Sequence, residues 1–119
     1  MTYYDMIELL FEWFPSLREK YIEEGDYIFE APTLCYSFVF VPFIVKSCED
    51  NDEDKLKRIG LFLEEMANCG DEMVEDLLVV GVLESVLPER NSVDILRAFL
   101  NKKTSEWLTL LEKDCGWAE

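Results

Sequence analysis

Hydrophobic residues recur along much of this chain at the spacing of a helix face. Ile7, Leu10, Phe11 and Phe14 stand at positions i, i+3, i+4 and i+7, so they share one side of a helix. The same spacing returns later, at Leu56, Ile59, Leu63 and Met66, and again at Val93, Leu96 and Leu100. We therefore expect an all-α fold of about seven short helices in a compact, antiparallel bundle resembling helical repeats. At 119 residues the chain has the length of one domain, residues 1–119.

Polar residues and glycines between these faces predict where the helices begin and end. Ser, Thr, Asp and Asn cap helix starts because their side chains accept hydrogen bonds from free N–H groups. The predicted N-caps are Thr2, Asn51 or Asp52, Asp71, Ser92, and Thr104 or Ser105. Glycine favours the left-handed backbone that often follows a helix, and the predicted stops are Gly25, Gly70 and Gly116.

The segment 32–50 allows two interpretations. Its valines and aromatic residues favour a strand, especially over Phe38–Val45. A cap at Thr33 after Pro32, and a run to Cys48 that is long for a strand, favour a buried helix instead. Pro42 would kink such a helix or confine a strand to a sheet edge. We favour the kinked helix and leave the strand open.

The stretch 68–86 is acidic at its start and apolar afterwards. Acids near a helix N-terminus are favoured by the helix dipole, and residues 77–83 contain no polar side chain. Such a run is typical of a central helix that other helices cover on all sides. Gly81 in its middle predicts the close approach of another helix, because glycine otherwise costs about 1 kcal/mol relative to alanine.

Charge adds the first indication of function. The formal net charge is −15, from 26 acids and 11 bases. The acids concentrate in residues 1–30 and 61–90, whereas the other two quarters of the chain are nearly balanced. Such a field repels nucleic acid and anionic membranes and attracts basic partners, although acidity can also serve solubility alone.

The residues needed for common catalytic and metal chemistry are missing. The chain has no histidine, which removes the most frequent general base and most zinc and di-iron ligand sets. Asp50, Asp52 and Asp54 imitate a calcium loop, but Lys55 stands where glycine is needed and Leu61 where glutamate is needed. Adjacent acids such as Glu64 and Glu65 diverge around a helix. We expect no enzyme activity, no cofactor and no metal.

The compartment is predicted from segments that are absent. The first residues carry Asp5 and Glu8 where a secretory signal needs positive charge. The longest apolar run, Phe38–Val45, is too short to span a bilayer. The four scattered cysteines form no C-x-x-C pair and are expected to be reduced thiols, mostly buried. A cytoplasmic protein without membrane contact is expected, and its oligomeric state stays open.

Acids and one tryptophan are the candidate partner-binding residues. Trp13 lies off the hydrophobic face of its helix beside Glu12, so it is either a partly exposed interface anchor or packed beneath the second helix. Tyr3 and Tyr4 are further candidate anchors. The candidate set is Glu8, Glu12, Trp13, Glu19, Glu23, Glu24, Glu64, Glu65, Asp71, Glu72, Glu75 and Asp76.

Several motifs carry a resemblance to a known group of proteins. They are a helix with FLEEM (Phe62–Met66), a GDE-x-V turn (Gly70–Val74) and an apolar helix ending in VLE (Val82–Glu84). With them the chain resembles a family of small bacterial proteins that is classed as a domain of unknown function. Members are similar to immunity proteins of polymorphic or contact-dependent toxin systems. The resemblance implies a small, acidic, cytosolic binding protein without catalytic residues.

These observations give one leading functional hypothesis and two alternatives. The first is an immunity protein that neutralises a basic toxin, such as a nuclease, by covering its basic surface. The second is a nucleic-acid mimic of the phage type that blocks a DNA-handling enzyme. The third is a helical scaffold or a small-ligand module with a cavity among its aromatic residues.

Overall fold

All the regular elements in the described part of the chain are helical. The computed structural model describes residues 1–24 and 31–116, except the side chains of Lys20, Tyr21, Glu23 and Glu24. Over these ranges there are seven continuous helices and no strand, which confirms the all-α prediction. The radius of gyration is 13.4 Å, close to the roughly 13.5 Å expected of a compact domain of this length.

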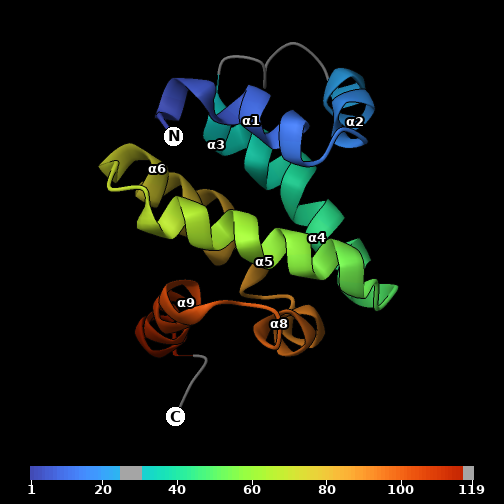
Figure 1. Cartoon of the computed structure of the whole chain (residues 1–119). Coiled ribbons are helices and arrows are strands. Elements are labelled where there is room, and N and C mark those ends of the chain that lie inside the picture. The colour runs from blue at the N-terminus through green and yellow to red at the C-terminus, as the bar shows by residue number, and fades with distance from the viewer. Residues whose placement is uncertain (25–30, 117–119) are drawn as a thin grey trace.

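The first helices lie at the top of the molecule (Figure 1). A 3₁₀ turn, η1 (Tyr3–Asp5), leads into α1 (Met6–Trp13), and α2 (Leu17–Glu24) follows Pro15. Thr2 precedes η1, but its side chain accepts no N–H bond, so the predicted side-chain cap is wrong; its hydroxyl instead donates to the Asp5 carboxylate at 2.7 Å. The predicted stop at Gly25 lies outside the described residues.

The ambiguous segment is one helix, so the helix interpretation is confirmed. It comprises α3 (Pro32–Cys35), a π-helical stretch η3 (Tyr36–Phe40) and α4 (Val41–Glu49). In a regular α-helix the Pro42 ring would collide with the carbonyl group four residues earlier. Here Val41 N–H donates to the Tyr36 carbonyl five residues back, so the helix is widened just before the proline.

Two more helices cross the middle of the molecule (Figure 1). The first is α5 (Glu53–Asn68), and the second comprises α6 (Glu72–Asp76), π-helical η4 (Leu77–Leu83) and α7 (Glu84–Val86). Asp52 and Asp71 cap their starts as predicted: Lys55 N–H donates to Asp52, and two N–H groups donate to Asp71. Gly70 has φ +79, the left-handed backbone expected of a stop.

The last two helices lie below α5 (Figure 1). They are α8 (Arg90–Arg97) and α9 (Lys102–Asp114). The Glu112 carboxylate is 5% exposed and pairs with both Arg90 and Arg97, which holds the two helices together. α9 ends before Gly116 at φ +77, as predicted.

Both predicted caps of these last helices are wrong. Ser92 is buried inside α8, which begins at Arg90, and its carbonyl accepts the Cys48 thiol at 3.5 Å. Thr104 and Ser105 lie inside α9, which begins at Lys102. A side chain of α5 supplies the cap of α9, as described below.

An aromatic cluster joins the top layer to the middle one. The rings of Phe14, Phe40 and Phe62 lie 5.3 to 5.7 Å apart, centroid to centroid. The buried Tyr36 hydroxyl donates to the Met6 carbonyl at 2.7 Å. Because these contacts fix α1 against α5, they also fix the groove between the two helices.

The structure also bears on two other expectations. All four cysteines are free thiols: Cys35 and Cys48 are buried, Cys69 is half-buried and Cys115 is exposed. Among the described residues no helix combines the length and apolar character needed to cross a bilayer.

Candidate functional site

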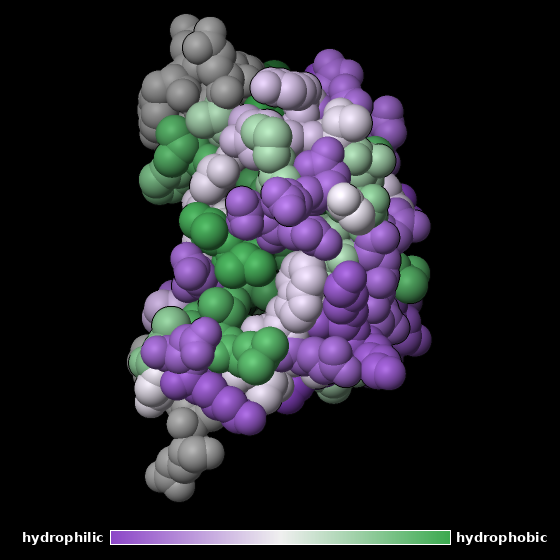
Figure 2. Space-filling model, turned by 90° about the vertical axis from the view of Figure 1, so that its left-hand side faces the viewer, coloured by the Kyte–Doolittle hydropathy of each residue, from purple (hydrophilic) through white to green (hydrophobic). Residues whose placement is uncertain are grey.

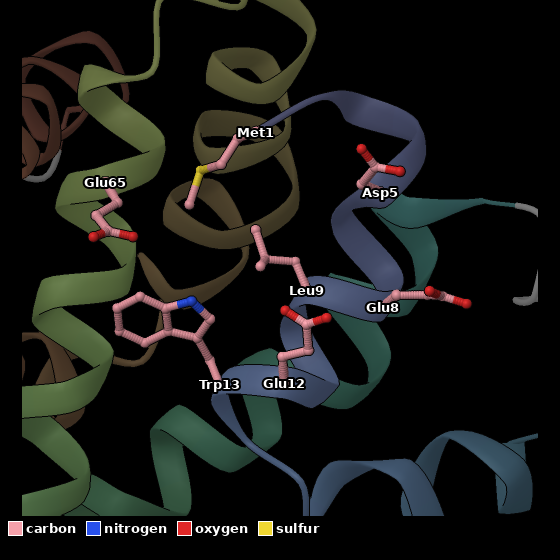
Figure 3. Close-up of a pocket in the computed structure, with 7 residues that line it drawn as sticks. All are labelled: Met1, Asp5, Glu8, Leu9, Glu12, Trp13 and Glu65. Carbon is pink, nitrogen blue, oxygen red and sulfur yellow. The ribbon is translucent and has the colours of Figure 1, made fainter.

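A groove between α1 and α5 holds four of the predicted residues. Its volume is about 400 Å³. Its lining contains four carboxylates and no basic side chain; the residues are Met1, Asp5, Glu8, Leu9, Glu12, Trp13 and Glu65. We call this surface the acidic groove. Figure 3 shows that its residues come from the N-terminal turn, α1 and one position on α5.

The periodicity of α1 explains this arrangement. Met6, Leu10 and Phe11 are buried against the core, which turns the opposite side of the helix outward. Asp5, Glu8 and Glu12 then follow one another at i, i+3 and i+7. Leu9 and Trp13 lie at the border between the buried and the exposed sides, and both are half-buried. They supply the apolar part of the groove.

Trp13 is the most firmly held residue of the groove. Its ring lies 5.1 Å from that of Phe62, and the Arg58 guanidinium stands 4.8 Å from the Trp13 ring centroid. Arg58 Nε also donates to the Trp13 carbonyl at 2.7 Å. Of the two sequence interpretations, the partly exposed tryptophan is observed, and its packing partner is α5. Its conformation is therefore set before any partner arrives.

The carboxylates take two positions around the tryptophan (Figure 3). Glu65 faces the indole across the groove from α5, and Glu12 lies beside the ring on α1. Asp5 and Glu8 point outward from α1 on the side away from Glu65. A cation entering the groove meets Glu12 and Glu65 next to an aromatic ring, and the two outer acids extend the negative field into solvent.

Glu64 has an internal role. Its carboxylate accepts hydrogen bonds from Thr104 N–H at 2.9 Å, from the Thr104 hydroxyl at 2.8 Å and from Lys103 N–H at 3.2 Å. Asn68 adds a fourth at 3.0 Å. Partial burial opposes ionisation of Glu64, but the bonds from Thr104, Asn68 and Lys103 outweigh it and lower the pKa of the carboxyl. We therefore leave Glu64 out of the acidic groove.

The remaining candidates lie elsewhere. Asp71 is occupied by its capping bonds to Met73 and Val74 N–H, at 2.9 and 3.2 Å. Glu19 is exposed on α2, while Glu72 and Asp76 are exposed and Glu75 is half-buried on α6. The side chains of Glu23 and Glu24 lie outside the described part of α2.

Sequence reasoning missed three contributors to the acidic groove, namely Met1, Asp5 and Leu9. Asp5 was not among the candidates, although its spacing to Glu8 and Glu12 places all three on one stripe. Leu9 was not considered, because a leucine beside a hydrophobic face is ordinary core material. The pairing of α1 with Glu65 of α5 had no local signal, since it arises from tertiary packing.

The carboxylates of the acidic groove favour binding of the cationic side chains of a partner protein. Within residues 1–24 and 31–116, no group of three or more Cys, Asp or Glu side chains is placed to hold a metal ion. Glu12 and Glu65 suit an arginine or lysine side chain of a partner, because guanidinium and ammonium groups pair with carboxylates; the Trp13 ring already carries the Arg58 guanidinium and adds an apolar surface beside them.

Comparison with known proteins matches most of the chain to a protein family. The model of a family described as a domain of unknown function, DUF7674, matches residues 7–114. This span includes α1 except its first residue, all of α5 and most of the acidic groove. No curated protein and no solved structure matches the chain significantly.

Proposed function

We propose that this chain, which belongs to the DUF7674 family, is a non-catalytic binding protein that neutralises a basic partner protein. The acidic groove is the observation that carries the proposal, because it joins four carboxylates to a fixed tryptophan without any basic side chain in its lining. The partner is proposed to be a bacterial toxin and the protein its cytoplasmic immunity factor.

A nuclease fits this role best among toxin classes. Nucleases hold phosphate backbones with lysine and arginine side chains, so their working surfaces are positive. The net charge of −15 speeds the encounter with such a surface by electrostatic steering. Trp13 and the neighbouring carboxylates then offer the aromatic and charged contacts from which interface hot spots are commonly built.

The first experiment identifies the partner. Tagged protein is incubated with nuclease-treated lysate of the native host, the resin is washed with increasing salt, and retained proteins are identified by mass spectrometry. We expect one stoichiometric basic protein to survive high salt. Many unrelated basic proteins lost together at modest salt would indicate nucleic-acid mimicry instead.

A matched pair of variants then tests the acidic groove. The triple variant Glu8→Gln, Glu12→Gln and Glu65→Gln removes three charges from the groove. The control Glu84→Gln, Asp94→Asn and Glu106→Gln removes three charges from exposed sites elsewhere. We expect the groove variant to weaken partner binding at least about a hundredfold and to flatten its salt dependence, and the control to weaken it less than about threefold. Equal losses in both variants would contradict the proposal.

A further inference from the structure

A second groove lies beside the acidic groove. It runs between the start of helix 32–49 and helix 72–86 and has a volume of about 240 Å³. Its lining residues are Tyr3, Thr33, Met73, Asp76, Leu77 and Val80. The turn η1 connects the two sites, because Tyr3 lines this groove and Asp5 lines the acidic groove. We call it the apolar groove.

The apolar groove exposes hydrophobic side chains in an ordered row. Met73, Asp76, Leu77 and Val80 stand at i, i+3, i+4 and i+7 of helix 72–86, and all four line the groove. Leu77 is 1% exposed and forms the floor, whereas Met73 and Val80 are 47% and 49% exposed. Figure 2 shows hydrophobic side chains gathered at mid-height on this side of the molecule, bordered by hydrophilic ones.

Charge limits what can occupy this groove. Asp76 lies in its lining, and Glu72 is exposed one turn earlier on the same helix. A second copy of the chain would bring another net charge of −15 against this rim, so self-association there is opposed. An occupant with basic residues beside its apolar ones complements both the row and the rim.

The fold limits the conformation of the occupant. No strand exists in the described residues, so an extended peptide finds no sheet edge for its backbone hydrogen bonds. A helix satisfies its own backbone groups and presents apolar side chains at i, i+3, i+4 and i+7. This spacing matches the row formed by Met73, Leu77 and Val80.

We propose that the apolar groove binds an amphipathic helix of the basic partner, with its apolar side chains between Met73 and Val80 and its lysines or arginines against Asp76 and Glu72. The inference rests on the proposed function, to which it adds the shape of the partner's binding element. The acidic groove, on the other side of η1, then binds a second part of the partner that carries only basic side chains.

The test uses a synthetic helical peptide as the probe. It is about 18 residues of leucine and lysine, long enough to be helical when bound, with the leucines on one face. A second peptide of the same composition has its leucines spread around the helix. Dissociation constants are measured by calorimetry for the wild type, Val80→Glu and the control Leu110→Glu, which changes an apolar side chain on α9 that is 57% exposed.

The Val80→Glu variant distinguishes docking of the apolar face of the peptide from non-specific charge attraction. Val80→Glu adds a negative charge, so non-specific attraction to lysines would bind the peptide more tightly. Docking of an apolar face is instead weakened, and we expect the dissociation constant of the amphipathic peptide to rise about tenfold. Leu110→Glu should change it less than about twofold, and the redistributed peptide should bind more weakly and should not be weakened by either variant.

Two results would overturn the inference. One is that Val80→Glu binds the amphipathic peptide as tightly as the wild type or more tightly. Met73→Glu is measured as a second variant, and circular dichroism confirms that both variants fold. The other is equal weakening by Val80→Glu and Leu110→Glu. Either result leaves the proposed function standing if the acidic-groove variant still loses the partner. Partner binding that survives neutralisation of the acidic groove would instead overturn the proposed function, whatever the peptide does.

Discussion

Two glycines in helices differ in what surrounds them. A Cβ added to Gly60 on α5 would lie 2.1 Å from the Phe99 carbonyl oxygen, which belongs to the backbone between α8 and α9. A Cβ added to Gly81 would meet the Leu77 Cδ1 atom at 3.1 Å and the Tyr36 Cβ atom at 3.5 Å. The first contact is with a backbone atom, whereas the nearest atom in the second is the end of a flexible side chain.

Alanine substitution should therefore separate the two positions. We expect Gly60→Ala to lower the free energy of unfolding by about 3 kcal/mol, because α5 and the α8–α9 connection must part. Gly81→Ala should stay within about 1 kcal/mol of the wild type, because the gain in helix propensity offsets a small shift of Leu77. Urea denaturation at pH 7 measures both. If both variants lost a similar free energy of unfolding, the close approach of the Phe99 carbonyl would not explain the effect of Gly60→Ala.

The sequence pointed to the less demanding of these glycines. Gly81 stands out because it interrupts an apolar helix, and the expected neighbouring helix is indeed present at Tyr36. Gly60 sits in an ordinary amphipathic pattern, and the carbonyl that requires it lies far along the chain. Local pattern shows where a glycine is unusual, but only tertiary structure shows where a side chain cannot fit.

Between elements, Glu64 joins two helices by capping one from the other. Its carboxylate on α5 accepts the N–H groups of Lys103 and Thr104 in the first turn of α9. Free N–H groups at a helix start need such acceptors, and a charged acceptor also interacts favourably with the helix dipole. The position of α9 against α5 thus depends on the ionisation of one side chain.

This cap should give the protein a specific sensitivity to acid. The pKa of Glu64 is lower in the folded protein than its ordinary value of 4.5. Its contribution to stability is therefore complete above pH 4.5 and is lost as the pH falls through the folded-state value. We expect Glu64→Gln to cost about 2 kcal/mol at pH 7. The difference from the wild type should shrink below pH 4.5 in urea denaturation.

An exposed acid provides the comparison for this prediction. Glu84→Gln changes a carboxylate that is exposed on α7, so it should leave the stability within about 0.5 kcal/mol at both pH values. A Glu64→Gln deficit that persisted at pH 3 would mean that its carboxylate acts through packing and not through its charge.

Helix starts were predictable where the capping side chain and the N–H groups that it accepts from are close in sequence. Asp52 and Asp71 accept bonds from N–H groups two or three residues ahead, so the sequence alone contains both halves of each interaction. The start of α9 was misplaced because its acceptor comes from α5. The helix over 32–49 was ambiguous for a related reason: its valines and aromatic residues fit a buried helix once neighbouring helices cover them.

At the scale of the whole molecule, the acidic groove gathers like charges. Asp5, Glu8, Glu12 and Glu65 all line it, with Glu12 and Glu65 nearest the indole and no basic side chain among the lining residues. Carboxylates held near one another repel, and this repulsion weakens with added salt. Concentrating acids for a partner therefore lowers the stability of the isolated protein.

Neutralising the groove should make the free protein more stable. We expect the Glu8→Gln, Glu12→Gln and Glu65→Gln variant to raise the Tm by about 3 °C at low salt, with a smaller gain at high salt. The variant Glu84→Gln, Asp94→Asn and Glu106→Gln lowers the net charge equally but should gain less, because its sites lie on three separate helices. Calorimetry in both buffers checks this. Equal gains would assign the effect to net charge alone.

The sequence predicted the fold class and the negative charge of the surface, but only some of the residues that line the acidic groove. Charge counting selected eleven of the twelve candidates, all but Trp13, because every acid contributes to the field wherever it lies. Glu8, Glu12, Trp13 and Glu65 come together, whereas Glu64 and Asp71 serve as helix caps. Which acids meet depends on the packing of α1 across α5, and that packing is set by Phe14 and Phe62 in the core.

The placement of Trp13 also allows binding at the acidic groove to be followed by tryptophan fluorescence. Indole emission shifts in colour and intensity with nearby charge and with water. Trp13 has an arginine over its ring and a glutamate opposite, in a hollow that a partner would close. Trp107 lies on α9, away from this hollow. The molecule thus carries its own optical probe at the surface where recognition is proposed, and it needs no attached dye.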